Sequence, residues 1–382
     1  MKLFKSLLVA PATLGLLAPM SVTANELNIA EVSSYSSSEE VQNISEFNTK
    51  EIAVTNSRVD GLEARMNNFD AGSFSETTQA SFTANFYLGA TDTDDTLATG
   101  TVSDKAMAGY DFQIGLTTSF TDGDSLAVTI DSGNAGGVGY AEFNGDNTTD
   151  ALTVDGISYT FPVGDATFIV GDNTDGSALF STACVYGGPS NTLDDCGNVN
   201  AGITNGGAMA GASYDFGNGF TTAIGYAGSE TSVMTEETTD AYGFNAAYTG
   251  DSYGLSVTYG VLETSATEEN TYTAFNGYYD ADGFPSVSIG YETGDLGGEA
   301  STVDETESFF VGLSSDIGPG SAGVALGHTT TEGSDEEYMY EVYYDYPVND
   351  GMTITPLLFV QEVATSGVDD TVGVMVKTSF SF

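Results

Sequence analysis

From Ser73 onward the chain repeatedly places apolar side chains at every second position, and this alternation constrains its fold more than any other feature. In segment 372–382, valine, threonine and phenylalanine share one face, whereas glycine, methionine, lysine and serine share the other. A period of two is that of a β-strand, whose successive side chains point to opposite faces of a sheet. The same alternation occurs in segments 110–120, 253–261 and 338–346. We therefore predict an all-β domain.

The face opposite the apolar one distinguishes a membrane barrel from a soluble sandwich. A sandwich would direct its apolar face inward, and its edge strands would need protection. Here the second face is rich in Gly, Ser and Thr, which suits the water-filled lumen of a closed barrel. After the N-terminal region, no segment approaches the ~20 apolar residues of a transmembrane helix. If the chain meets a membrane, it crosses it with strands.

The connections between the alternating segments are of two kinds, which follow each other strictly along the chain. Seven are short and rich in Gly, Asp or Pro: 121–123, 162–164, 217–219, 250–251, 280–283, 318–320 and 349–351. Eight are longer and acidic or polar, near residues 92–104, 134–149, 172–206, 229–239, 263–270, 295–305, 331–336 and 365–369. This pattern predicts a transmembrane antiparallel β-barrel of about sixteen strands, with a broken register in 152–161 that leaves the count open by two.

The charge balance excludes other classes of protein. The chain has 55 acidic and only 7 basic residues among 382, and its formal net charge is -48. A nucleic-acid-binding protein needs Lys and Arg to neutralise phosphates, so we expect no nucleic-acid partner. Disorder would account for the acidity but not for the 22 Phe and 21 Tyr residues, because disordered chains are poor in aromatics.

The first 70 residues differ from the rest. Residues 1–24 join a short basic start to an apolar run and small residues, which is typical of a secretory signal peptide. Residues 25–70 are predicted to be periplasmic and to contain a short helix, leaving 71–382 as the barrel. An apolar seam at heptad spacing defines that helix, with the principal positions Ile52, Val59, Leu62, Met66 and Phe69. The seam fits either a small self-associating coiled coil or a single amphipathic helix that caps the barrel.

Few residues resemble a catalytic or metal-binding motif. Residues 318–323 match the dinucleotide pattern G-x-G-x-x-G, but they lie in a turn between strands with no helix after them. The single histidine, His328, has no catalytic motif around it and is predicted to be a solvated rim residue. Asp92, Asp94 and Asp95 lack the Gly and Glu of an EF-hand, which favours solvated charge over loose Ca²⁺ or Mg²⁺ binding. We expect no enzyme activity, cofactor or metal site.

The two ends of the barrel carry a resemblance to a known family. The alternating C-terminus with Phe380 and Phe382 resembles the signal that the barrel assembly machinery reads in bacterial outer-membrane proteins. Segments 28–35, 40–47 and 57–65 resemble the start of cyanobacterial outer-membrane porins, a family also described as carbohydrate-selective. The resemblance implies a homotrimeric channel in outer-membrane lipid. That family usually carries an S-layer-homology domain after the second of these segments; this chain lacks it, so cell-wall binding is in doubt.

Two functions in particular remain open from the sequence: a passive channel for inorganic ions and small polar solutes, and a carbohydrate-selective channel. A structural tether to the wall is disfavoured by the missing domain. Residues 25–70 hold 9 of the 55 acids, so 46 remain for the barrel and loops, against Lys105 and Lys377 alone. Acidic rings favour cations. The alternation points four acids and one base into the lumen: Asp111, Asp131, Glu341, Asp345 and Lys377.

The two cysteines, Cys184 and Cys196, lie in the longest connection and are predicted to form a disulfide, as an isolated pair in an exported protein does. In many sixteen-stranded porins the third outer loop folds into the lumen. By that resemblance, segment 172–206 would narrow the channel, with Asp194 and Asp195 facing the pore. A disulfide in an outward-facing loop is the alternative.

Overall fold

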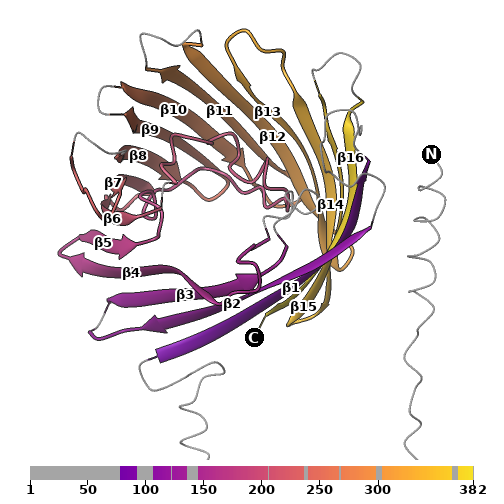
Figure 1. Cartoon of the computed structure of the whole chain (residues 1–382), viewed down its shortest axis with the longest axis horizontal. Helices are drawn as coiled ribbons and strands as arrows, with labels where there is room; N and C mark the ends of the chain where they lie inside the picture. The colour runs from indigo at the N-terminus through magenta and orange to yellow at the C-terminus, as the bar shows by residue number, and fades with distance from the viewer. Residues whose placement is uncertain are drawn as a thin grey trace, which may run out of the picture. The chain divides into compact units, whose positions relative to one another are not determined.

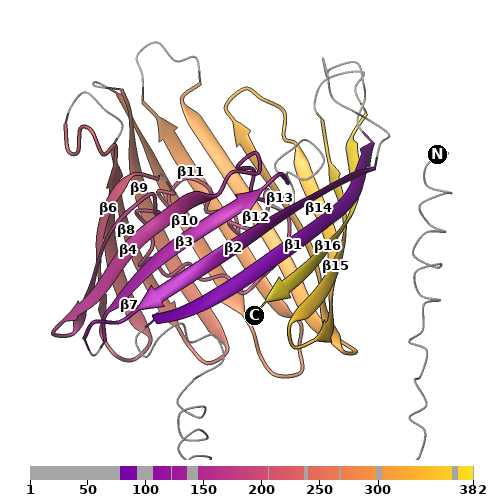
Figure 2. The same ribbon diagram turned by 60° about the horizontal axis from the view of Figure 1, so that its bottom comes forward.

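The structure, a computed structural model, describes residues 78–92, 106–121, 123–135, 145–204, 206–235, 240–265, 268–297, 303–363 and 369–381. These residues form a closed antiparallel barrel of sixteen strands, each hydrogen-bonded to its neighbours in chain order (Figures 1 and 2). The strands are β1 (Thr78–Asp92), β2 (Met107–Thr118), β3 (Ser125–Gly133), β4 (Thr153–Val163), β5 (Ala166–Asp172), β6 (Ala208–Asp215), β7 (Phe220–Gly228), β8 (Ala241–Thr249), β9 (Tyr253–Ser265), β10 (Glu268–Tyr279), β11 (Ser286–Leu296), β12 (Glu305–Ile317), β13 (Gly320–Thr331), β14 (Tyr338–Asn349), β15 (Met352–Gln361) and β16 (Thr371–Ser381).

The barrel closes where the first strand meets the last. Thr83 of β1 pairs with Ser381 of β16, and the ladder continues to Asp92 opposite Val372. Closure pairs the backbone groups that would otherwise be left at two sheet edges, which hydrocarbon cannot satisfy. The predicted all-β class and the predicted sixteen strands are confirmed. Among the described residues there is no helix of the length and apolarity needed to cross a membrane.

Side chains alternate between the two faces of the wall as the sequence predicts. On β9, Leu255 and Tyr259 are exposed on the outside, while Ser256 and Thr258 are buried inside. Near the short turns the outer face carries paired aromatic rings, such as Tyr159 stacked on Phe161 at 5.4 Å. An apolar outer band with aromatic residues at its border is the surface that a lipid bilayer requires.

The short turns owe their geometry to glycine. Gly164 joins β4 to β5 and Gly318 joins β12 to β13, and both have a positive φ, at 63° and 66°. Glycine adopts this conformation without the steric cost that a Cβ would bring. Residues 318–323 therefore belong to a hairpin, as predicted, because residues 318–319 form the turn and Gly320 already begins strand β13.

The broken register in 152–161 has a local cause. Thr129 of β3 pairs with Gly156 of β4, but the next residue, Ile130, pairs with Val154. Asp155 is thus an extra residue, a β-bulge, and the alternation reverses across it. On the N-terminal side of the bulge Val154 points outward, and on its C-terminal side Ile157 points outward.

One predicted loop is wrong, and several predictions lie outside the described residues. The connection expected at 263–270 is almost all strand, since β9 ends at Ser265 and β10 begins at Glu268. The predictions that lie outside the described residues concern the signal peptide, the helix seam (Ile52, Val59, Leu62, Met66 and Phe69), Lys105 and Phe382. Phe380 is described, and its ring contacts that of Phe86 across the closure, at 6.0 Å between centroids.

Candidate pore constriction

The connection between β5 and β6, residues 173–207, runs inside the barrel and not over its rim (Figure 1). Its outgoing arm is fixed by backbone N–H groups that donate to inward-facing side chains. Ser181 N–H donates to Asn245 Oδ1 of β8 at 3.0 Å, and Ala183 N–H donates to Ser256 Oγ of β9 at 2.9 Å. Tyr186 N–H donates to Ser288 Oγ of β11 at 3.1 Å. The arm therefore follows the inner wall from β8 to β11.

The returning arm follows the same wall in the opposite direction, because Cys196 lies against Gly290 of β11 and Ala201 lies against Gly260 of β9. Asn276 of β10 donates from Nδ2 to the carbonyl oxygen of Cys196 at 2.8 Å. Glu292 of β11 accepts from the backbone N–H of Asn200 at 2.9 Å and of Ala201 at 2.8 Å. The Glu292 side chain is 1% exposed, so its carboxylate is fully engaged as an anchor for the loop. Hydrogen bonds to an ionised acceptor are stronger than those to a neutral one.

Glycines on the inner wall leave the room in which the loop lies. A Cβ added at Gly290 of β11 would stand 1.7 Å from the carbonyl oxygen of Cys196. One added at Gly225 of β7 would stand 2.0 Å from the carbonyl oxygen of Gly176. At these two positions backbone lies directly against backbone, which only glycine permits.

The tip of the loop packs on an apolar part of the wall. Tyr186 and Leu193 join a buried cluster whose wall members come from β1 and β12–β16: Tyr87, Phe310, Ala325, Met339, Tyr343, Leu357, Phe359 and Met375. The inner face, predicted to be rich in Gly, Ser and Thr, is apolar on this side. Inward apolar residues are stable there because the loop covers them.

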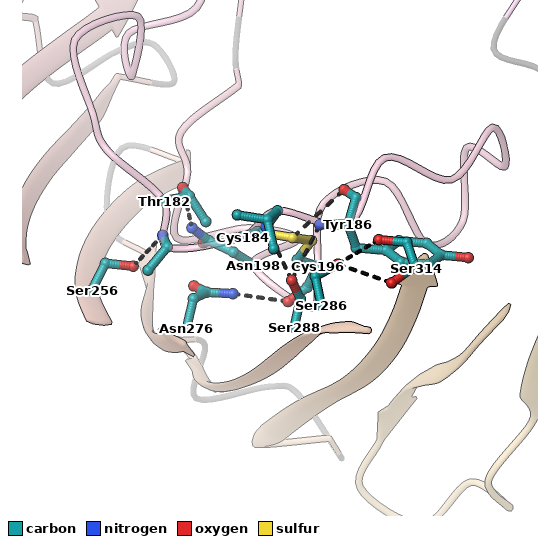
Figure 3. Close-up of a disulfide and its surroundings, with 12 residues drawn as sticks. Thr182, Cys184, Tyr186, Cys196, Asn198, Ser256, Asn276, Ser286, Ser288 and Ser314 are labelled. Atoms are coloured by element: carbon teal, nitrogen blue, oxygen red, sulfur yellow. Dashed lines mark hydrogen bonds between the residues drawn. A yellow bond between two sulfur atoms is a disulfide. The ribbon is translucent and has the colours of Figure 1, made fainter. Parts of the chain in front are cut away.

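The two arms of the loop are joined by the predicted disulfide (Figure 3). Cys184 and Cys196 are bonded, with 6.4 Å between their Cα atoms, which confirms the prediction. Around the bond, Figure 3 shows Ser256, Asn276 and Ser288 of the wall reaching the backbone of both arms. The cross-link and the wall contacts thus hold the same stretch of loop.

Asp194 and Asp195 lie at the loop tip next to Cys196 and are both exposed. Protein encloses Asp195 on its other sides, and this partial desolvation is the main reason that its pKa is raised to about 7. Repulsion by the charges of Asp194, Glu292 and Asp175 raises the pKa further. Desolvation also raises the pKa of Asp194.

The five wall residues expected in the lumen all point inward but differ in their surroundings. Glu341 is 2% exposed and accepts a hydrogen bond from Tyr186 Oη at 2.6 Å, so the loop covers it. Asp111 and Asp131 are 5% exposed; Asp111 accepts from Tyr87 Oη at 2.5 Å, and Asp131 accepts from Thr153 Oγ1 at 2.6 Å.

Asp345 and Lys377 are the two less buried members of that set. Asp345 accepts a hydrogen bond from Thr355, which pairs in the β15–β16 ladder with Lys377. Lys377 lies within electrostatic range of Asp345 and Asp111. Within the described ranges, no group of three or more His, Cys, Asp or Glu side chains is placed to hold a metal ion.

The prediction for His328 is wrong. Its side chain is 9% exposed and lies on the outer face of β13 between two aromatic rings, with centroid distances of 4.7 Å to Tyr338 and 6.1 Å to Phe309. It alternates with inward-facing residues and belongs to the aromatic border of the barrel, not to a solvated rim.

Sequence reasoning missed the residues that seat the loop: Asn245, Ser256, Asn276, Ser288 and Glu292. Each was included only in the general observation that the inner face is polar. The one available signal was the repeated glycine at inward positions of neighbouring strands, such as Gly225 and Gly290, which leaves space for a second backbone.

Solved structures of bacterial outer-membrane channels resemble this barrel. An anion-selective porin from Comamonas acidovorans matches with a TM-score of 0.61 at 13% identity, over 80% of this chain and 99% of that one. OprB of Pseudomonas putida matches with a TM-score of 0.61 at 11% identity, over 85% and 97%. A mutant of the Rh. blastica porin matches with a TM-score of 0.55 at 17% identity, over 80% and 100%. The fold is that of a porin.

The porin fold is all that likenesses at these identities establish. No protein-family model matches the chain, and no curated protein matches its sequence. A porin fold with an apolar outer band points to the outer membrane as the location of the protein.

Proposed function

We propose that this protein is an outer-membrane diffusion channel for inorganic ions and small polar solutes, and that it favours cations. The observation that carries the proposal is the loop of residues 173–207, which lies inside the barrel and exposes Asp194 and Asp195 at its tip. The sequence has no arginine after Arg65, so no arginine of the barrel opposes these acids. Acidic groups at a narrow point of a pore attract cations directly.

The wall residues support the same sign of selectivity. Asp345 faces the lumen and is only partly buried, whereas Lys377 is the one lumenal base among the described residues. Burial of Asp111, Asp131 and Glu341 by hydrogen-bonded neighbours leaves Asp194, Asp195 and Asp345 as the acids best placed to meet a passing ion.

The carbohydrate-selective alternative needs aromatic rings that a sugar can stack on. Tyr343, the candidate for this role, is 4% exposed and lies edge-on to Tyr186, with 5.9 Å between ring centroids. Its face is therefore covered. Single-channel recordings in a planar bilayer, with increasing concentrations of maltose and other sugars, test both proposals. We expect stepwise ohmic currents that sugars reduce only as they reduce bulk conductivity; saturable block by a sugar would favour the alternative, and no channels at all would reject both.

We further propose that the channel is a homotrimer in the outer membrane and that Phe380 and Phe382 belong to its assembly signal. The outer face of β6 offers Ala208, Ala210 and Ala212 where other strands carry larger apolar residues. Small side chains allow close approach of a second protein surface.

A further inference from the structure

The described base of the connection between β3 and β4 also contacts the inner wall of the barrel. The described parts of this connection are residues 134–135 and 145–152. Asp146 N–H donates to Oδ2 of the inward-facing Asp111 at 3.3 Å, and the carbonyl oxygen of Asp146 accepts from Ala135 N–H at 3.1 Å. Ala135 is completely buried. The base of this loop is therefore seated on the inner wall.

Two residues of β1, Asn85 and Tyr87, donate hydrogen bonds to Asp111 and so hold the residue that the loop contacts. Asp111 also accepts hydrogen bonds from Tyr87 Oη at 2.5 Å and from Asn85 Nδ2 at 2.8 Å, so its carboxylate is held by three donors. A Cβ added at Gly145 would lie 3.2 Å from the Tyr87 ring, which places the loop backbone on that ring. Asp111 and Tyr87 thus position the loop, and the Asp146 side chain stays partly open to solvent.

Asp146 lies among acids of three strands. The charges of Asp111 on β2, Asp131 on β3 and Asp155 at the β4 bulge all repel it. Asp155 in turn repels Asp175 of the β5–β6 loop, and Asp175 repels Asp195 at the tip of that loop. Acidic groups within electrostatic range of one another therefore link the two inward loops, and Tyr87 of β1 is the neutral titratable group that packs against them.

We propose that the described base of the β3–β4 connection is a second selectivity element of this channel and that Asp146 is its specificity-determining residue, acting with Asp194 and Asp195. The proposal rests on the proposed channel function. A cation that enters from the loop side meets Asp146 as a fixed negative charge, held in place by Asp111. Partial burial, followed by the repulsion of the three wall acids, raises the pKa of Asp146 to about 6, so the group is ionised at neutral pH.

The same loop provides a matched control. Asp150 is exposed and accepts from Tyr110 Oη at 2.9 Å, and Tyr110 lies on the outer face of β2, opposite in direction to Asp111. Asp146 and Asp150 are both aspartates of the β3–β4 connection, but Asp146 lies on the inner side of the wall and Asp150 on the outer side. Removing either changes the net charge of the protein equally.

The test is the reversal potential in a planar bilayer under a KCl gradient for the wild type, Asp146→Asn, Asp146→Glu and Asp150→Asn. We expect Asp146→Asn to lower the cation-to-anion permeability ratio about twofold, because one charge acts in opposite senses on a cation and an anion over roughly 8 Å of water, and salt at about 0.1 M, with a Debye length of about 10 Å, screens about half of that effect. Asp146→Glu should restore the ratio, and Asp150→Asn should leave it unchanged. An unchanged ratio in Asp146→Asn, or equal shifts in both Asn variants, would overturn the proposal. The sign of the wild-type potential tests the channel's selectivity separately.

A second variant tests the side chain in the folded channel. The two native cysteines are bonded to each other, so Asp146→Cys would add a single free thiol. An anionic methanethiosulfonate applied to open channels should raise cation selectivity, and a cationic one should lower it. Opposite shifts at Asp146→Cys and none at Asp150→Cys support the proposal; no response at Asp146→Cys to either reagent overturns it.

Discussion

The carboxylates inside this barrel divide into two kinds according to what they bind. Glu292 and Glu341 are buried and accept hydrogen bonds from the β5–β6 loop, so their charges are used within the protein. Asp194 and Asp195 are exposed at the tip of that loop. A carboxylate whose oxygens are occupied by N–H or O–H donors stabilises structure, whereas an exposed one acts on passing ions.

Glu292→Gln is expected to loosen the loop without much effect on selectivity. The amide offers one acceptor oxygen, and its NH₂ group would face the N–H groups of Asn200 and Ala201. A buried hydrogen bond to a charged group is worth about 1.5–3 kcal/mol, enough to populate displaced loops. Single-channel recordings should show increased current noise relative to Glu305→Gln, an exposed outward control. Quiet wild-type-like currents would contradict the anchoring role.

The raised pKa of Asp195 predicts a pH dependence of selectivity. Because that pKa is raised to about 7, the carboxylate is charged above this pH and neutral below it. Cation selectivity should therefore fall as the pH is lowered from about 8 to about 6. Asp195→Asn should start lower and show a smaller step, because Asp146, with a pKa raised to about 6, still loses part of its charge over this range. The reversal potential at a series of pH values measures it, and a wild-type value that stays constant over this range would contradict the assignment.

At the scale of elements, the β5–β6 loop is held by wall hydrogen bonds, by its fit over inward glycines and by a disulfide. The disulfide closes a loop with a sequence separation of 12 residues. By the chain-entropy estimate, such a closure contributes roughly 3 kcal/mol. A loop fixed in three ways inside a barrel should behave as a rigid part of the channel.

The double variant Cys184→Ser, Cys196→Ser should form channels that conduct with higher noise and a larger mean conductance, because the two arms would separate. The barrel itself should remain, since its ladders do not involve the bond. Recordings of the wild type with and without a reductant provide a second comparison. Equal conductance and equal noise in the double variant would rule out a constriction that depends on the disulfide.

Gly290→Val tests the seat of the loop from the wall side. The new side chain would collide with the backbone of Cys196, because a Cβ at position 290 would stand only 1.7 Å from the carbonyl oxygen of Cys196. The collision should displace the returning arm. We expect a larger conductance and reduced cation selectivity. Gly202→Ala is the matched control, because its Cβ would meet no atom closer than 3.7 Å. Unchanged conductance in Gly290→Val would show that the arm does not lie there.

The strands could be predicted from the sequence because their signal is local. Alternation at period two and glycine turns, such as Gly164 and Gly318, identify each strand from its own residues. The inward path of the loop was predicted only from resemblance to porins, because its contacts join residues far apart in the chain, such as Tyr186 and Glu341. His328 was misplaced for the same reason: its neighbours Phe309 and Tyr338 lie on other strands.

At the scale of the whole molecule, an apolar outer surface and an acidic interior divide the protein's chemistry between lipid and water. The proposed trimer would bury part of the outer surface, and the alanine face of β6 is the expected place of contact. Native mass spectrometry in mild detergent should give three times the monomer mass of 39.6 kDa, less any leader removed on export. A monomer mass alone would contradict the trimer, although each barrel could still conduct.

We expect the interior of this barrel to select cations, and the reversal potential of the wild-type channel measures that selectivity. With 46 acids after residue 70 against two bases, and with Asp194 and Asp195 exposed inside the barrel, the potential under a KCl gradient should have the cation sign. It should decrease at high salt, where screening shortens the range of each charge to about 3 Å. A potential near zero or of the anion sign at low and moderate salt would contradict the account.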